Sequence, residues 1–287
     1  MKPSDLPVMS ALPAPRWEAR LSLGYALRGA GRSTLVHRSH RGPLRVQRDF
    51  YPEGLHTCHN IVVHPPGGIV GGDQLALEVN LAQASAALLT TPGAGKWYRS
   101  AGMPASQHLQ FTIGRGASLE WLPQETIVFN GAIAQMQTEI HLDTDARYLG
   151  WEILCLGRTA RAETFQRGRL QQHTQLFQCG QRLWTEQAQL EGDDPVLHSA
   201  LGLDGHPVCA TLIAAGVDLQ DDTIAALRAV TAGNDARCGV TRLPRLTMAR
   251  WLGDSSEQAR HYCTNLWQVL RPAMRGVAAV VPRIWAT

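Results

Sequence analysis

The chain has 287 residues, of which 44% are apolar and 18% are charged, and its formal net charge is +3. This composition excludes an intrinsically disordered protein, which combines low hydrophobicity with high net charge, and so small a net charge does not by itself indicate nucleic-acid binding. No stretch approaches the ~20 apolar residues of a membrane span, and the N-terminus lacks an apolar stretch of signal-peptide length.

The first segment, residues 1–15, contains four prolines, which disfavour both helices and central strands. We expect a flexible arm there, followed by one β-rich domain over residues 16–287. From about residue 17 to residue 190, apolar and polar residues alternate with a period of two, and turn residues recur every eight to twelve positions. The alternation is clearest over residues 75–81, 109–113 and 136–142.

Two helices are expected late in the chain. The first covers residues 222–232, from an acidic cap to Gly233. The second covers residues 255–271: Ser255 and Gln258 form a capping box, and Pro272 is expected to end it. One side of this helix is an apolar stripe, which indicates either packing in the core or a contact with a partner helix. The stripe consists of Ala259, Tyr262, Cys263, Leu266, Trp267 and Leu270.

Six cysteines lie at Cys58, Cys155, Cys179, Cys209, Cys238 and Cys263. They show no short repeating spacing, and a chain of this size does not need disulfides to fold. We therefore expect free thiols in a soluble cytoplasmic protein.

Two glycine-rich segments resemble nucleotide-binding loops without matching them. In residues 65–73, Ile69 stands where a dinucleotide fingerprint needs its second glycine, and a strand pattern follows instead of a helix. The glycines give backbone freedom for a close approach of another chain or group; they are Gly67, Gly68, Gly71 and Gly72.

Residues 92–96 end like a phosphate loop, but Thr90 replaces the first glycine, and Trp97 stands where Ser or Thr would bind magnesium. A nucleotide site is therefore not expected here. The polar side chains of Lys96, Tyr98 and Arg99 belong either to a solvated turn or to a contact surface.

Signatures of serine hydrolases, zinc proteases and Cys-x-x-Cys sites do not occur in the sequence. Two alternatives stay open at this point. One is a cysteine-dependent hydrolase in which Cys58 acts with His59 or His64, because such partners meet only in space. The other is a β-rich nucleic-acid-binding module that uses the arginine-rich residues 28–48.

Four residue types that bind soft metals lie close together: His56, Cys58, His59 and His64. In an extended strand, His59 points away from the other three, so the four cannot bind one ion without a bend. The segment is either an ordinary half-buried strand or a transient site for a passing metal.

Three carboxylates lie in unusual surroundings. Asp73 follows the glycine loop, Glu152 interrupts an apolar run, and Glu186 follows Trp184 in a strand-like segment. Burying a carboxylate is costly unless it is paired or hydrated. Each carboxylate therefore either pairs with an arginine or faces water inside the protein.

Several blocks of the sequence resemble the urease accessory protein UreD family, which is called UreH in some bacteria. The match runs from about residue 17 to the end and is weak over residues 190–240. The blocks are YPE at 51–53, TCH at 57–59, HPPGGIVGGD at 64–73, TPGAGKWYRS at 91–100, LEWLPQE at 119–125, LCLGR at 154–158, ETF at 163–165 and PRIWAT at 282–287.

The resemblance implies a mostly β protein, a twisted helix-like stack of strands with two helices toward the C-terminus. It implies a cytoplasmic, non-enzymatic scaffold that links the urease apoprotein to UreF and, through UreF, to the GTPase UreG. Nickel would be a transient cargo and no cofactor would be bound permanently; neither nucleic acid nor a membrane is an expected partner.

The same resemblance implies roles for individual residues. Asp73, Glu152 and Glu186 would be carboxylates along a nickel passage, with Cys58, His59 and His64 as soft metal-binding positions. UreF would contact residues 255–271 and 282–287. The side chains expected at that contact are Tyr262, Leu266, Trp267, Arg283 and Trp285.

Overall fold

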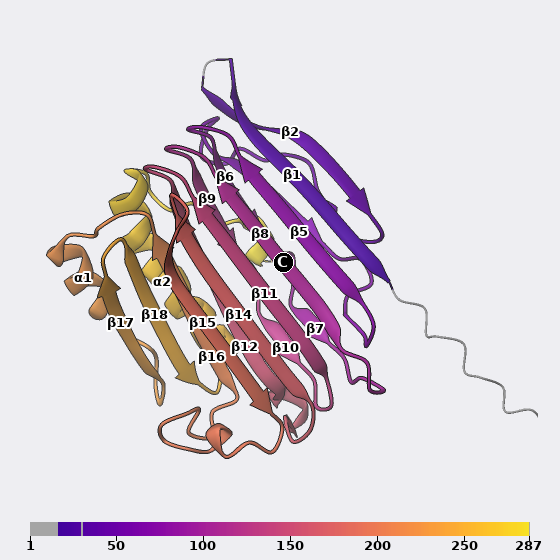
Figure 1. Cartoon of the computed structure of the whole chain (residues 1–287). Helices are drawn as coiled ribbons and strands as arrows, with labels where there is room; N and C mark the ends of the chain where they lie inside the picture. The colour runs from indigo at the N-terminus through magenta and orange to yellow at the C-terminus, as the bar shows by residue number, and fades with distance from the viewer. Residues whose placement is uncertain (1–16, 30, 287) are drawn as a thin grey trace, which may run out of the picture.

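The computed structural model describes residues 17–29 and 31–286, so the arm predicted over residues 1–15 lies outside the described residues. About half of the chain is in strands, which form two stacked sheets (Figure 1). The prediction of a mostly β protein is therefore confirmed.

The first sheet has seven strands. Its order is β15 (Gln181–Glu191), β14 (Arg169–Gln178), β11 (Ile133–Leu142), β8 (Ala105–Ile113), β5 (Gln74–Leu81), β1 (Glu18–Arg28) and β2 (Arg32–Arg41). The five inner strands, β14, β11, β8, β5 and β1, run parallel to one another. The two edge strands, β2 and β15, are antiparallel to their neighbours.

The second sheet has eleven strands. Its main path is β17 (Arg237–Leu243), β18 (Leu246–Gly253), β16 (Val208–Ala215), β12 (Arg147–Arg158), β9 (Ser118–Leu122), β6 (Ala86–Thr90), β4 (Cys58–Val63) and β3 (Arg45–Val46). Three short strands join it beside this path: β7 (Gly95–Trp97), β10 (Thr126–Val128) and β13 (Glu163–Thr164).

Between β4 and β14 the chain passes back and forth between the sheets and builds a solenoid-like stack of about four turns. The period of two explains this arrangement, because alternate residues of a strand face opposite sides of the sheet. In β5, for example, Leu75, Leu77, Val79 and Leu81 are buried between the sheets. The helix-like stack of strands is confirmed.

The stack is extended by β16, β17 and β18, which are antiparallel and were not assigned from the sequence. Two α-helices lie in this part of the described chain, α1 (Asp221–Arg228) and α2 (Ser256–Arg275). Elsewhere in the described residues, short 3-10 turns lie at Thr159–Arg161, Pro195–Leu197 and Arg283–Ala286. The helices cover the outer face of the eleven-stranded sheet (Figure 1). No described helix is long and apolar enough to cross a bilayer.

Both helix ends differ from the prediction. The first helix ends at Arg228 and not at residue 232. The β-branched Val230 and Thr231 favour helix less, and the carbonyl of Ala232 accepts a hydrogen bond from Trp251 Nε1 at 2.8 Å instead of a helical one.

The second helix continues through Pro272 to Arg275 and ends at Gly276, whose φ is 70°. A proline this close to a helix end removes a single intrahelical hydrogen bond. The buried side chains of Arg271 and Met274 hold the last turn in place.

The apolar stripe of α2 packs into the core of this chain. Tyr262, Leu266 and Trp267 are at most 2% exposed and lie against the eleven-stranded sheet. The prediction that these three side chains contact UreF is therefore wrong for the folded chain. Their burial supplies the main attachment of α2, because each large apolar side chain contributes about 1.5–3 kcal/mol when it is removed from water.

Candidate functional site

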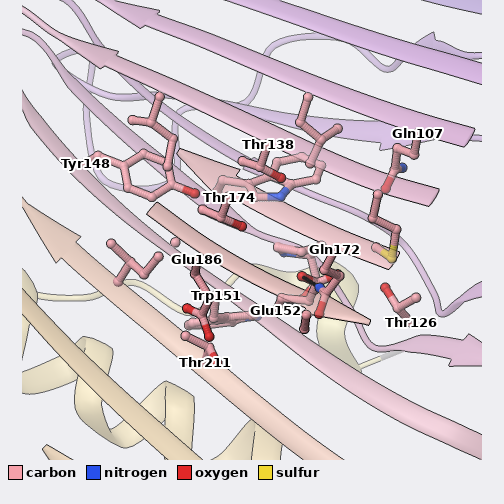
Figure 2. A pocket seen from close by; sticks show the side chains of 18 residues that line it. Gln107, Thr126, Thr138, Tyr148, Trp151, Glu152, Gln172, Thr174, Glu186 and Thr211 are labelled. Atoms are coloured by element: carbon pink, nitrogen blue, oxygen red, sulfur yellow. Dashed lines mark hydrogen bonds between the residues drawn. The ribbon is translucent and has the colours of Figure 1, made fainter. Parts of the chain in front are cut away.

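A cavity of about 120 Å³ lies between the two sheets. It is lined by residues of β8, β11, β14 and β15 on one side and of β9, β10, β12 and β16 on the other. The side chains of Glu152, Gln172, Glu186 and Thr174 gather in the gap (Figure 2). Polar and apolar side chains both line the cavity, and its size gives room for several water molecules beside the polar ones.

Glu152 extends from β12 into this cavity. Its carboxylate accepts a hydrogen bond from Gln172 Nε2 on β14, and no cationic side chain pairs with it in the described part of the chain. Burial raises the pKa of Glu152 to about 7; the hydrogen bond from Gln172 opposes this rise, and the charge of Glu186 adds to it. A carboxyl group with such a pKa is partly protonated near neutral pH.

Glu186 lies on the edge strand β15, where the cavity meets a second, more open one of about 390 Å³. Its Oε1 is 2.7 Å from Nη2 of Arg250 on β18, and these side chains are 29% and 54% exposed. Both cavities are lined by Glu152, Gln172 and Glu186, so they meet at the carboxylates.

Cys209 and Arg237 also line the outer cavity. Burial raises the pKa of the Cys209 thiol to about 12, and the nearby charge of Glu152 adds to this rise. The thiol is therefore protonated at neutral pH, and the oxygen atoms of the two glutamates are the stronger ligands for a hard or borderline cation.

Asp73 is not part of this site. It precedes β5, and three strands separate β5 from β15. Its side chain is buried, and its Oδ2 accepts a hydrogen bond of 2.9 Å from the backbone N–H of Val70, which closes the glycine loop. The structure thus brings together two of the three predicted carboxylates and gives Asp73 a role in the turn.

The predicted soft ligands do not converge. Cys58 is fully buried beside Asn60, whereas His59 faces the other side of β4 and contacts Glu53. His64 lies near Asp73, and burial lowers its pKa although the carboxylate opposes this. Within the described residues, no three His, Cys, Asp or Glu side chains are grouped to hold a metal ion.

The Cys58 nucleophile is not supported. Burial raises the pKa of this thiol to about 12, whereas an activated thiol is accessible and has a lowered pKa. The neighbouring His59 points away from it and is held by Glu53.

The two glycine-rich motifs pair with each other. The N–H of Ile69 donates to Lys96 O at 2.7 Å, and the N–H of Tyr98 donates to Ile69 O at 2.8 Å. A Cβ on Gly68 would lie 2.0 Å from the Tyr98 ring, so only glycine fits there. Lys96 is part of β7, and Arg99 packs against Gly131. The segment is therefore paired at Lys96 and Tyr98, whereas Arg99 follows the strand and is exposed.

The C-terminal tail folds back on the same sheet. The ring of Trp285 lies against Trp151 and Trp267, with centroids 5.6 and 5.9 Å apart, and its Nε1 donates to Thr90 Oγ1 at 2.8 Å. Trp285 is therefore partly buried against its own chain, whereas Arg283 is exposed.

A cluster of buried charges beneath α2 was not predicted. Arg271 is 0% exposed; its Nη2 is 2.5 Å from Glu53, and its Nε is 2.9 Å from Glu120. Arg275 Nη1 lies 3.1 Å from Glu120, and Trp267 Nε1 donates to the same carboxylate. Two signals in the sequence pointed here: Glu120 interrupts an apolar strand, and Arg271 continues the apolar stripe of α2.

Two further residues at the cavity could not be predicted from local sequence patterns. Gln172 and Arg250 contact the glutamates only because the stacked sheets bring them together, across 20 and 64 residues of chain.

Comparison with known proteins identifies the family. Residues 18–286 match the family model described as UreD urease accessory protein. The chain is 48% identical over 287 residues to the urease accessory protein UreD of Dechloromonas aromatica, covering 99% of each chain. It is 46% identical to the proteins of the same name from Methylobacillus flagellatus, covering 95% of each, and from Pseudomonas fluorescens Pf-5, covering 99% of this chain and all of the other. The chain belongs to the UreD urease accessory protein family.

Proposed function

We propose that this accessory protein passes nickel between its two sheets toward the urease apoprotein. The observation that carries the proposal is Glu152, a carboxyl group inside the stack that faces a polar cavity and has an amide partner instead of a cationic one. A carboxylate in this position is costly unless water or a passing cation solvates it. Ni²⁺ is here a cargo and not a resident cofactor.

The chemistry of the lining suits transport rather than storage. Glu152 and Glu186 offer oxygen ligands, which hold Ni²⁺ less tightly than a closed set of imidazoles and thiolates does. A conducting site has to bind its ion strongly enough for entry and weakly enough for release. The non-enzymatic role agrees with this reading, because weak sites in series need no nucleophile.

We also propose that the chain connects the urease apoprotein to UreF and, through UreF, to UreG. Because Tyr262, Leu266 and Trp267 are buried, the contact with UreF would use the outer face of α2 and the tail around Arg283. Val277 and Val281 follow α2 and are 41% and 47% exposed, which gives this side an apolar component suited to a protein partner.

The test is nickel loading of urease with Glu152→Gln and Glu186→Gln variants, measured as metal per urease active site. Glutamine keeps the size of the side chain but removes the charge that attracts the cation. We expect a loss of at least tenfold in loading by Glu152→Gln, while the complex with urease and UreF still assembles in co-purification.

The control is Asp73→Asn. Asparagine keeps the acceptor for the Val70 N–H, and the position lies outside both cavities. This variant should load urease normally. Full loading by both glutamate variants would rule out the passage between the sheets and leave the docking role.

A further inference from the structure

We propose that Arg250 gates the outer end of the cavity: its guanidinium holds Glu186 across the gap between the sheets, and an entering divalent cation has to displace it. This inference rests on the proposed function, because it concerns how the same passage is opened. It assigns a regulatory role to a side chain outside the carboxylate pair.

The register of the strands places Arg250 at the gap. In the eleven-stranded sheet, Glu152 pairs with Thr211, and Thr211 pairs with Arg250, so the three positions form one row across β12, β16 and β18. Glu186 lies on the edge strand of the other sheet. The 2.7 Å ion pair between Arg250 and Glu186 therefore ties the two sheets together where the stack is open.

The lining of the two cavities places the gate in the outer one. Glu152 and Glu186 line both the inner and the outer cavity, whereas Arg250 lines only the outer one. A cation in the outer cavity, which both carboxylates also line, meets the guanidinium that holds Glu186. Its positive charge repels the cation, and its hydrogen bond occupies the oxygen atom that would serve as the first ligand.

The ion pair is also easy to open. Arg250 is 54% exposed, and exposed ion pairs contribute little to stability because water solvates both partners after they separate. The Arg250 side chain also contacts Met248 Sδ at 3.3 Å, so it has a neighbour on its own strand. A divalent cation therefore competes with a singly charged and weakly held guanidinium.

Arg237 provides a matched control. It lines the same outer cavity, but its guanidinium pairs with Asp204 instead of either cavity glutamate. Removing Arg237 changes the local charge by the same amount as removing Arg250 and leaves the Glu186 ion pair intact. Comparing the two variants separates a general charge effect from the release of Glu186.

The experiment measures binding of Ni²⁺ alone to the full-length chain by equilibrium dialysis. We expect Arg250→Gln to bind Ni²⁺ about two- to fivefold more tightly than the wild type, the range that corresponds to an exposed ion pair. Arg237→Gln should show a smaller change. The gain should disappear in the double variant Arg250→Gln/Glu186→Gln, because the freed ligand is then missing.

Equal affinities for wild type and Arg250→Gln would overturn the gate, as would a gain that persists in the double variant. Unchanged circular dichroism and an unchanged unfolding midpoint establish that Arg250→Gln is folded. The nickel-loading test distinguishes failure of the gate from failure of the passage. If only the gate proposal is wrong, Glu152→Gln still lowers nickel loading of urease. If the passage proposal is wrong, Glu152→Gln loads urease normally.

Discussion

Glutamates in two regions of the protein interior are stabilised in opposite ways. Beneath α2, Glu53 and Glu120 are held by two arginines and a histidine. Between the sheets, Glu152 has only an amide partner and faces a cavity. The first arrangement neutralises buried charge with fixed cations, whereas the second leaves it available to water or to a mobile cation.

The glutamates of the two regions also differ in their pKa values. Burial alone would raise the pKa of Glu53, but hydrogen bonds from His59 and Arg271 lower it to about 2. At Glu152 burial prevails and the pKa rises to about 7. The same side chain is thus a permanent anion in one region and a group that titrates near neutrality in the other.

The largest effect is expected for Arg271→Met. This change leaves Glu53 and Glu120 buried without their main cation, and breaking a buried ion pair from one side costs about 3–5 kcal/mol. The free energy of unfolding, measured with urea, should fall by this amount. Adding Glu53→Gln and Glu120→Gln should restore part of it. A loss below ~1 kcal/mol would show that the cluster is hydrated rather than dry.

The second largest effect is expected on the stability of the fold at acidic pH. Because the folded pKa of Glu53 is about 2 against an ordinary value of 4.5, its contribution to stability is fully present above pH 4.5 and is lost as the pH falls toward 2. The shift corresponds to a stabilisation of about 3 kcal/mol. Unfolding free energies between pH 5 and pH 2 should decline less steeply for Glu53→Gln than for the wild type; parallel curves would contradict the assignment.

The third effect has the opposite sign. The folded pKa of Glu152 is raised from 4.5 to about 7, so ionisation destabilises the metal-free fold as the pH rises from 4.5 and costs its full amount above 7. Glu152→Gln should be more stable than the wild type at pH 8 by about 2 kcal/mol. This value is lower than the full pKa shift would give, because water in the cavity partly solvates the carboxylate. At pH 4 the two proteins should unfold alike. Equal stability at pH 8 would mean that the carboxylate is well solvated.

The smallest effect is expected for Arg250→Gln. Its ion pair with Glu186 is half-exposed, and such pairs contribute less than ~1 kcal/mol. Urea unfolding of this variant beside Arg271→Met compares two arginine–glutamate pairs that differ mainly in burial. A loss near that of Arg271→Met would mean that the outer end of the cavity is closed by a structural tie instead of a gate.

Much of the fold was predictable from local patterns. The alternation over residues 75–81, 109–113 and 136–142 reports strands directly, because one side of each strand is buried. The capping box of Ser255 and Gln258 correctly predicted the start of α2. In the structure, the Ser255 hydroxyl accepts a hydrogen bond from the N–H of Gln258. Helix ends were less accurate, because Pro272 is tolerated where buried Arg271 and Met274 anchor the last turn.

The candidate site was predictable only in part. Glu152 stood out as a charge within an apolar run, and the structure places it at the cavity. Asp73 stood out equally but closes a turn through Val70. A charge in an apolar context shows that some compensation exists without showing whether a backbone N–H, an arginine or water provides it.

By itself, the sequence determined the strand periodicity, the amphipathic helix, the glycine-rich motifs and the family to which they belong, because these depend on residues that are near one another in the chain. The tertiary structure alone decided which acids are paired. Arg271 reaches Glu53 across 218 residues and Arg250 reaches Glu186 across 64. Such contacts depend on how the two sheets stack and on where α2 lies, and the energy of a buried charge is set by those distant neighbours.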